Sequence, residues 1–294
     1  MFKSILELVK LANEKNFTIG DIVLAEEVKN SKSTQKILLD RMLQNIDIMK
    51  KSSIIKNTKS FSGLSGDNAY TYENSSNKGK LLSPLMTNAI TKAMAIAEEN
   101  ARMGTIVASP TAGSCGIIPG SLLSFADENN VSDEKVARAL FNCAGIGMVI
   151  AKKATLSGAE GGCQAECGSA AAMAASALVE LSGGSPSMCS MAVAFALKSV
   201  LGLVCDPVCG FVEVPCIKRN ASGVVNAISS AEMALCGMKS MIPADEVIEA
   251  MAEVGKLMNY KLKETAIAGL AGTKTAQKIK EVGSDYITKG VLEN

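Results

Sequence analysis

Nine cysteines in a chain of 294 residues carry the most distinctive chemistry of this sequence. Three of them, Cys143, Cys189 and Cys236, lie in apolar stretches of helical pattern and are interpreted as small buried hydrophobic side chains. The other six lie beside glycine or proline: Cys115, Cys163, Cys167, Cys205, Cys209 and Cys216. Turn residues bring backbone N–H groups toward a sulfur atom and leave space for a bulky cofactor, so this second group is the candidate for metal binding or catalysis.

Three kinds of site are compatible with the spacing of these cysteines. Cys163 with Cys167 and Cys205 with Cys209 form two C-x-x-x-C pairs, which could bind zinc as a four-cysteine site, although structural zinc spacings are usually shorter. Cys163, Cys205 and Cys216 are separated by 42 and 11 residues. Three thiolates would leave one iron of a 4Fe-4S cluster open as a Lewis acid. Reduced structural cysteines are the third possibility.

Composition limits the class of protein. Hydrophobic residues make up 48% of the chain and charged residues 20%, which is ample for a core, and we expect one catalytic domain over residues 1–294. The net charge of +1 gives no reason to expect a nucleic-acid or anionic-membrane partner. No stretch is long and apolar enough to span a bilayer. The cysteine content without a signal peptide favours a reducing, cytoplasmic location.

The elements that must position the cysteines are predicted to be helices. Residues 1–56 show amphipathic helical patterns, 57–80 form a Gly/Ser-rich loop or lid, and 81–294 form the cysteine-containing core. Helices are predicted over 81–102, 113–128, 132–152, 161–181, 186–203, 221–238 and 243–258. The best strand candidates, 105–108 and 211–214, are short. The predicted fold class is therefore all-α, with short irregular or strand segments around the cysteine loops.

Five motifs in order resemble one known family. They are SPTAGSCG (109–116), GAEGGCQAE (158–166), GLVCDPV (202–208), VPCIKRN (214–220) and ETAIAGLA (264–271). Together they closely resemble the iron–sulfur L-serine dehydratases, in particular the separate α chain, and the resemblance runs from about Phe61 to the C-terminus. It implies conversion of L-serine to pyruvate and ammonia without pyridoxal phosphate. It also implies a 4Fe-4S cluster held by Cys163, Cys205 and Cys216, with Cys167 and Cys209 as neighbours only.

Two loops are candidates for binding the substrate. The segment containing Ser109, Thr111, Ala112, Gly113 and Ser114 precedes a predicted helix and could cradle a carboxylate with hydroxyls and backbone N–H groups, although an ordinary helix start would look similar.

The second candidate wall or lid contains Ser62, Gly63 and Asp67, and a solvated loop is its alternative. Here the chain reads Gly66-Asp67-Asn68 where the family more often has Gly-Gly-Asp, which leaves the role of Asp67 open. Charged residues around the cysteine motifs could support the site or simply pair within the fold: Glu160, Glu166, Asp206, Glu213, Lys218 and Arg219.

The group that removes the α-proton is not evident. Histidine, the usual base near neutral pH, does not occur in the chain. Lys80, Lys152 and Lys153 would each need a strongly lowered pKa. We therefore expect the β chain of this family to complete the active site in a hetero-oligomer. Two other functions compete with this one: a non-catalytic zinc- or cluster-binding scaffold, and a related lyase acting on threonine.

Overall fold

The computed structural model describes residues 2–282, and the predicted all-α fold is confirmed there. Within this range the only β-type pairing is an isolated bridge between Cys205 and Lys263. The strand candidates at 105–108 and 211–214 were wrong, since both are irregular. Each is only four residues long and has no partner strand, and an isolated extended segment of that length is not stable as a sheet.

The N-terminal part is helical, as its amphipathic pattern predicted, and contains three helices. They are α1 (Ile5–Lys15), α2 (Ile19–Ser31) and α3 (Gln35–Ser52). Ser4, Thr18 and Thr34 cap them, each accepting a hydrogen bond from a backbone N–H group of the first turn. The helices α2 and α3 pack against α7 (Asp133–Lys153), and α1 packs against α10 (Pro186–Lys198) and α12 (Ala244–Leu257).

One short helix interrupts the predicted 57–80 loop. This helix, α4 (Asn68–Glu73), packs against α5 (Pro84–Ala101). Its six residues are too few to give a readable amphipathic pattern, and α5 rather than propensity holds it in place.

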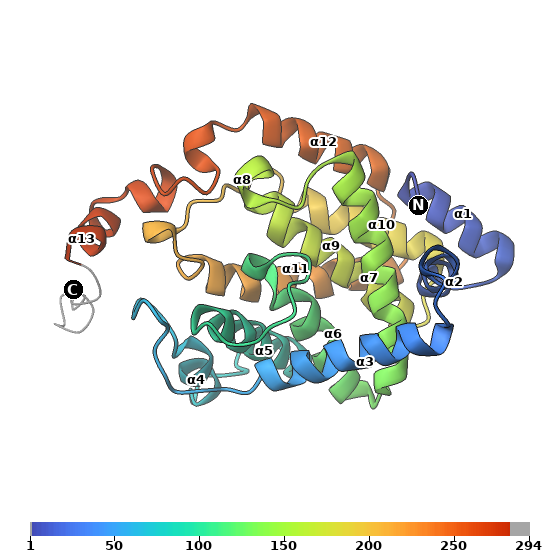
Figure 1. Cartoon of the computed structure of the whole chain (residues 1–294), viewed down its shortest axis with the longest axis horizontal. Coiled ribbons are helices and arrows are strands. Elements are labelled where there is room, and N and C mark those ends of the chain that lie inside the picture. Colours follow the sequence, from blue (N-terminus) through green and yellow to red (C-terminus); the bar gives the residue numbers. More distant parts are fainter. Residues whose placement is uncertain (1, 283–294) are drawn as a thin grey trace.

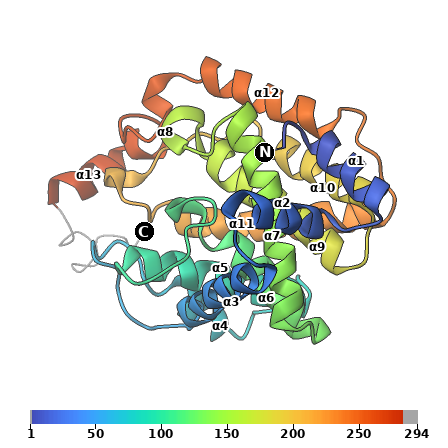
Figure 2. The same ribbon diagram turned by 45° about the vertical axis from the view of Figure 1, so that its right-hand side comes forward.

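An alanine-rich helix lies at the centre of the molecule. This helix, α9 (Ser169–Leu181), packs against α6 (Ile117–Asn129), α7, α10 and α11 (Cys216–Leu235) (Figures 1 and 2). Every residue from 169 to 179 is buried. Small side chains let the surrounding helices approach closely, so α9 forms a rigid support for the segments at its N-terminal end. The chain continues through α12 to α13 (Lys274–Val282).

Several predicted helix boundaries differ from the structure by a few residues, and two of the differences involve cysteines. The predicted 161–181 helix is broken into α8 (Gly158–Gly161), a π-helical turn over Gln164–Gly168, and α9. Gly162 separates the first two with φ of 78°, which favours glycine. The predicted 221–238 helix instead begins at Cys216, directly after Pro215. Both corrections place cysteines at the ends of elements.

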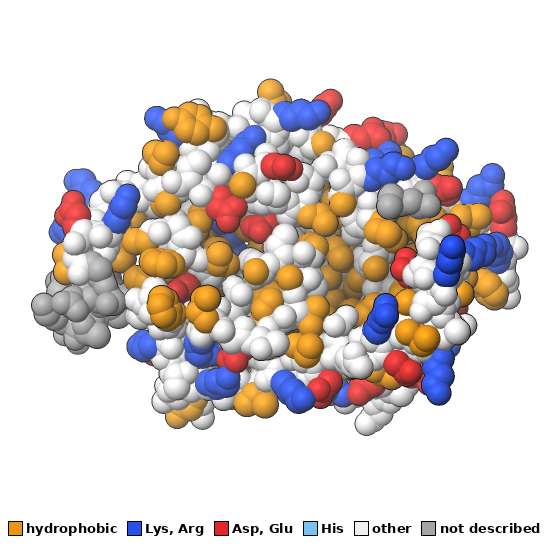
Figure 3. Space-filling model, viewed as in Figure 1, with side chains coloured by type: hydrophobic (Ala, Val, Ile, Leu, Met, Phe, Trp, Pro, Cys, Tyr) orange, Lys and Arg blue, Asp and Glu red, His pale blue; other side chains and the backbone are white. Residues whose placement is uncertain are grey.

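The surface shows no concentration of one charge on the face in Figure 3. Most lysine and arginine side chains there lie around the outer edge, and the centre carries mainly hydrophobic and uncharged groups. Within residues 2–282, no helix combines the length and apolarity that crossing a membrane requires.

Candidate functional site

The three predicted ligand cysteines converge from three separate segments. Cys163 starts the π turn after α8, Cys205 lies in the connection after α10, and Cys216 is the first residue of α11 (Figure 1). Burial is the main cause that raises the pKa of the Cys205 and Cys216 thiols, and negative charge on Cys163 raises both further. The three sulfur atoms therefore lie close enough for their charges to interact. In contrast, Cys115 is fully buried with its sulfur 4.0 Å from the Ile96 carbonyl oxygen, as a core residue.

These thiols resist carrying negative charge together. Burial, and then the charge of Cys163, raises the pKa of Cys216 to about 12. Burial and then the Glu166 carboxylate raise the pKa of Cys205 further. The pKa of Cys163 is lowered, first by its hydrogen-bonded contact with the Cys167 thiol, at a sulfur–sulfur distance of 3.3 Å. The set would therefore ionise fully only beside added positive charge, as thiol ligands do on binding a metal.

A buried glutamine joins the Cys163 turn to the Cys205 segment. The Gln164 side-chain amide donates to the carbonyl oxygens of Gly161 (2.9 Å) and Met251 (3.1 Å) and accepts from the Gly202 N–H (2.9 Å). Its own backbone N–H donates to the Leu203 carbonyl oxygen at 3.0 Å. Because Gln164 follows Cys163 directly, these bonds hold the backbone from which that sulfur projects.

A buried asparagine joins the Cys216 helix to the predicted carboxylate cradle. Asn220 accepts from the Gly116 N–H (2.9 Å) and donates to the carbonyl oxygens of Gly113 (2.8 Å) and Cys216 (2.9 Å). It is fully buried. Asn220 therefore connects the cradle to the first turn of α11.

An ion pair holds the Cys205 segment against α11. Arg219 contacts the carboxylate of Asp206 at 2.9 Å and donates to the Val204 carbonyl oxygen at 2.9 Å. Asp206 also accepts from the backbone N–H of Leu270, at 2.7 Å, within the C-terminal 264–271 motif. The same guanidinium helps to lower the pKa of Cys163.

The Glu166 carboxyl group lies between the cysteines and the cradle. It accepts a hydrogen bond from the Thr111 hydroxyl at 2.9 Å, and that hydroxyl lies 3.0 Å from the Ser114 hydroxyl. On its other side it lies 3.9 Å from the Cys205 sulfur. Burial raises the pKa of Glu166, and the Thr111 hydrogen bond opposes that change.

Glycines on both sides make room for this carboxyl group. A Cβ atom on Gly158 would lie 2.6 Å from a Glu166 carboxylate oxygen and 3.0 Å from the Cys205 sulfur, and one on Gly113 would lie 3.2 Å from Glu166. Glycines from two different motifs thus lie in close contact with one side chain, and the contact at Gly158 is the tighter of the two. The structure places the predicted cradle residues Thr111, Gly113 and Ser114 around Glu166.

The second predicted wall is bound to the cysteine segment through Glu213. This buried carboxylate accepts hydrogen bonds from the hydroxyls of Ser60 (2.6 Å), Ser62 (2.6 Å) and Ser65 (2.5 Å). Glu213 lies three residues before Cys216 in the chain. Its three charge-assisted hydrogen bonds therefore hold residues 60–65 close to the segment that contains Cys216.

The other predicted residues of the wall and the cradle do not all lie at one site. Ser62 and Ala112 line one cavity of about 450 Å³, which brings the wall and the cradle together. Gly63 occupies a turn with φ of 79°. Asp67 pairs with Lys59 at 2.7 Å and is partly exposed. Ser109 precedes Pro110 in a cis peptide, and its hydroxyl donates to the Val107 carbonyl oxygen at 3.4 Å.

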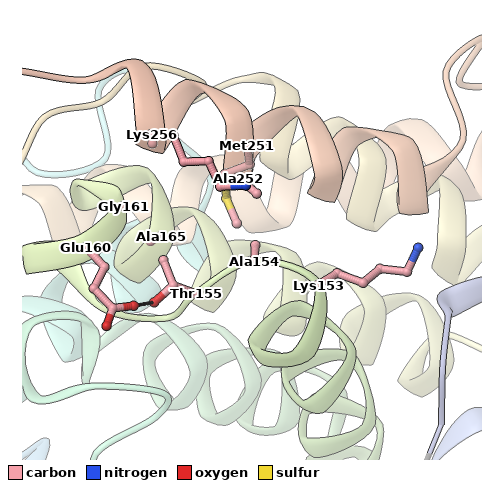
Figure 4. A pocket seen from close by; sticks show the side chains of 10 residues that line it. Lys153, Ala154, Thr155, Glu160, Gly161, Ala165, Met251, Ala252 and Lys256 are labelled. Atoms are coloured by element: carbon pink, nitrogen blue, oxygen red, sulfur yellow. Dashed lines mark hydrogen bonds between the residues drawn. The ribbon is translucent and has the colours of Figure 1, made fainter.

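A separate cavity lies behind the Cys163 turn, between α12 and the end of α7. It has a volume of about 300 Å³ (Figure 4). Lys153, one of the lysines considered as a base, lies at its edge with its amine directed away from Thr155 and Glu160. That amine pairs with Glu249 at 2.7 Å and Asp245 at 3.5 Å. The Glu249 hydrogen bond raises the pKa of Lys153, so the lowered pKa that a base would need is not found.

Within residues 2–282, no three histidine, cysteine, aspartate or glutamate side chains meet closely enough to hold a single metal ion. The sequence analysis named the charged residues that flank the motifs. It did not predict that Gln164 and Asn220 would connect the cysteine segments to their neighbours. A polar amide directly after Cys163, and another four residues after Cys216, could have indicated these contacts.

The chain is similar to known proteins over most of its length. A family model described as serine dehydratase alpha chain matches residues 14–271. The chain is 44% identical to the "Probable L-serine dehydratase, alpha chain" of Bacillus subtilis, covering 96% of this chain and 95% of that protein. It is 43% identical to the L-serine dehydratase alpha chain of Peptoniphilus asaccharolyticus, covering 99% and 100%. With L-serine dehydratase 2 of Escherichia coli it shares 46% identity over 61% of this chain and 40% of that longer protein.

Proposed function

This chain belongs to the serine dehydratase alpha chain family, and on that premise we propose that it converts L-serine to pyruvate and ammonia. The observation that carries the proposal is the convergence of Cys163, Cys205 and Cys216 beside a hydroxyl-lined cradle. We assign the whole chain, residues 1–294, to one catalytic domain located in the cytoplasm, with residue 1 and residues 283–294 outside the described part.

The donor set fits a 4Fe-4S cluster held by Cys163, Cys205 and Cys216. Thiolates that bind different iron atoms of a cluster do not meet at one point, which agrees with the lack of a single-ion site among the described residues. Cys216 starts a long helix, whose N-terminal dipole favours a thiolate. When bound, such a cluster would supply a Lewis acid for the hydroxyl and carboxylate of serine, without pyridoxal phosphate.

The residues of this chain would bind and orient the substrate. The Ser114 hydroxyl and the backbone N–H groups near Ala112 would receive the serine carboxylate, while the Thr111 hydroxyl, 3.0 Å from that of Ser114, would help to shape the cradle. Glu166 positions Thr111 by accepting its hydrogen bond. The Ser60–Ser65 segment, held by Glu213, would form the opposite wall and limit access of water.

The proton acceptor is proposed to come from a β chain. This chain contains no histidine, and Lys153 is engaged in two ion pairs. Two relatives are themselves called alpha chains, and a third is much longer than the part that this chain matches. These facts support a hetero-oligomer in which the partner completes the active site.

An anaerobic assay tests this proposal. The chain would be purified without oxygen, alone and co-expressed with the β chain, and then assayed for iron, sulfide and pyruvate formation from L-serine and L-threonine. We expect about four iron atoms per chain, with turnover only in the presence of the partner and higher kcat/KM for serine. A single zinc ion would contradict the cluster, preference for threonine would contradict the substrate, and full activity of the chain alone would contradict the partner's role.

A further inference from the structure

Cys163 and Cys167 form a sulfur–sulfur contact that cluster binding by Cys163, Cys205 and Cys216 does not use. The Cys167 thiol lies 3.3 Å from the Cys163 sulfur, and both side chains are at least 95% buried. Among residues 2–282, no other pair of cysteine sulfurs makes such a contact. The contact exists because the chain between them turns as a π helix over Gln164–Gly168, so residues four apart face the same side.

We propose that Cys163 and Cys167 are an oxidation site, forming an intrachain disulfide when the cluster is absent and hydrogen peroxide is present. The inference rests on the proposed function in one respect, that Cys163 is a cluster ligand. The disulfide would remove this ligand from the cluster site and at the same time protect its sulfur from irreversible oxidation.

The geometry permits this bond. Disulfides need Cα atoms about 4.4–6.8 Å apart. Two residues one helical turn apart, as Cys163 and Cys167 are, fall in this range. The sulfur atoms, now 3.3 Å apart, must approach by about 1 Å to reach bonding distance. Rotation of the two side chains supplies a shift of this size without moving α8 or α9.

The chemistry balances with peroxide as the only oxidant. Peroxide oxidises the Cys163 thiol to a sulfenic acid and releases one water. The Cys167 sulfur then attacks the Cys163 sulfur, the S–S bond forms, and the hydroxyl leaves with the Cys167 proton as a second water. Two thiols are oxidised and one peroxide is reduced. A dithiol reduces the disulfide back to the two cysteine thiols by thiol–disulfide exchange.

Peptide mapping of the full-length chain without cluster tests the proposal. The chain would be prepared anaerobically with a chelator, treated with one equivalent of hydrogen peroxide, and digested with a protease that cleaves after glutamate. Cleavage after Glu166 separates the two cysteines into peptides 161–166 and 167–180. We expect these peptides to remain joined, with the loss of two hydrogen masses, until dithiol is added.

Two variants complete the experiment. Cys167→Ala should give no joined peptides and should accumulate oxygen adducts on Cys163. Cys189→Ala, which removes a buried thiol of the helical core, should leave the joined peptides unchanged. Joining of 161–166 to 181–213 or 214–232, or oxygen adducts alone on the unsubstituted chain, would overturn the proposal. Peptide mapping does not measure enzyme activity. Its result is therefore independent of the assay for serine dehydration.

Discussion

Two regions of the molecule contain the same residue types in different settings. The cysteine centre comprises Cys163, Cys205, Cys216 and Glu166. The helical core, around α7, α9 and α10, contains Cys143, Cys189 and Glu180. In both regions the thiols are largely buried and burial raises the pKa of the carboxyl group. Burial by itself therefore does not mark the functional cysteines.

The regions differ in what the backbone does. In the helical core the buried carboxylate is satisfied by neighbouring helices: Glu180 accepts from the Asn142 side chain at 2.6 Å and from the Gly20 N–H at 3.1 Å. The Cys143 thiol donates to the Met173 carbonyl oxygen at 3.4 Å.

In the cysteine centre Cys163 and Cys216 lie at the starts of helical elements and Cys205 lies in a connection. Thiols outside a helix interior can turn toward one another and toward a ligand. This placement, rather than burial, distinguishes the three cysteines from Cys143 and Cys189, which lie within helices.

The largest contrast is expected in iron content. Cys163→Ala, Cys205→Ala and Cys216→Ala should each abolish iron binding, because a cluster that loses one of three protein ligands is not retained. Cys167→Ala and the core variant Cys143→Ala should keep it. Iron analysis of anaerobically purified proteins measures this. Retention of a full iron complement by any of the first three variants would remove that cysteine from the ligand set.

A second contrast compares the two carboxyl groups. Glu166→Gln should lower kcat/KM for serine by about 10- to 100-fold, since the cradle hydroxyl of Thr111 loses its charged acceptor and its orientation. Glu180→Gln should leave kcat/KM within about twofold, because its partners lie in the core. Steady-state kinetics of the reconstituted enzyme with the β chain tests this, and equal effects of the two substitutions would refute the distinction.

The smallest effect is expected at Glu213, which binds the Ser60–Ser65 segment. Glu213→Ala leaves three serine hydroxyls without their acceptor, which should cost about 1–3 kcal/mol. Faster hydrogen exchange in residues 58–66 should accompany a raised KM, with kcat nearly unchanged. The single-hydroxyl variant Ser62→Ala should show a smaller change of the same kind. Unaltered exchange in Glu213→Ala would show that this carboxylate does not hold the segment.

The sequence determined the helical class, most helix positions and most of the division of the cysteines into two groups, although Cys115, grouped with the candidate ligands, lies in the core. Helical periodicity and alanine content are local, and so α7, α9 and α12 were predictable. The turn residues beside Cys163, Cys205 and Cys216 were also local signals, and the family resemblance was carried by motifs that the sequence contains in full.

Only the tertiary structure decided which groups meet. Glu166 contacts Thr111 across 55 positions of the chain, and Glu213 contacts Ser60 across 153. Asn220 binds Gly116 across 104 positions. No periodicity or spacing rule reports such pairs, because they depend on how α5, α9 and α11 pack. The chain alone specified which residues could do chemistry, and helix packing determined which of them share one site.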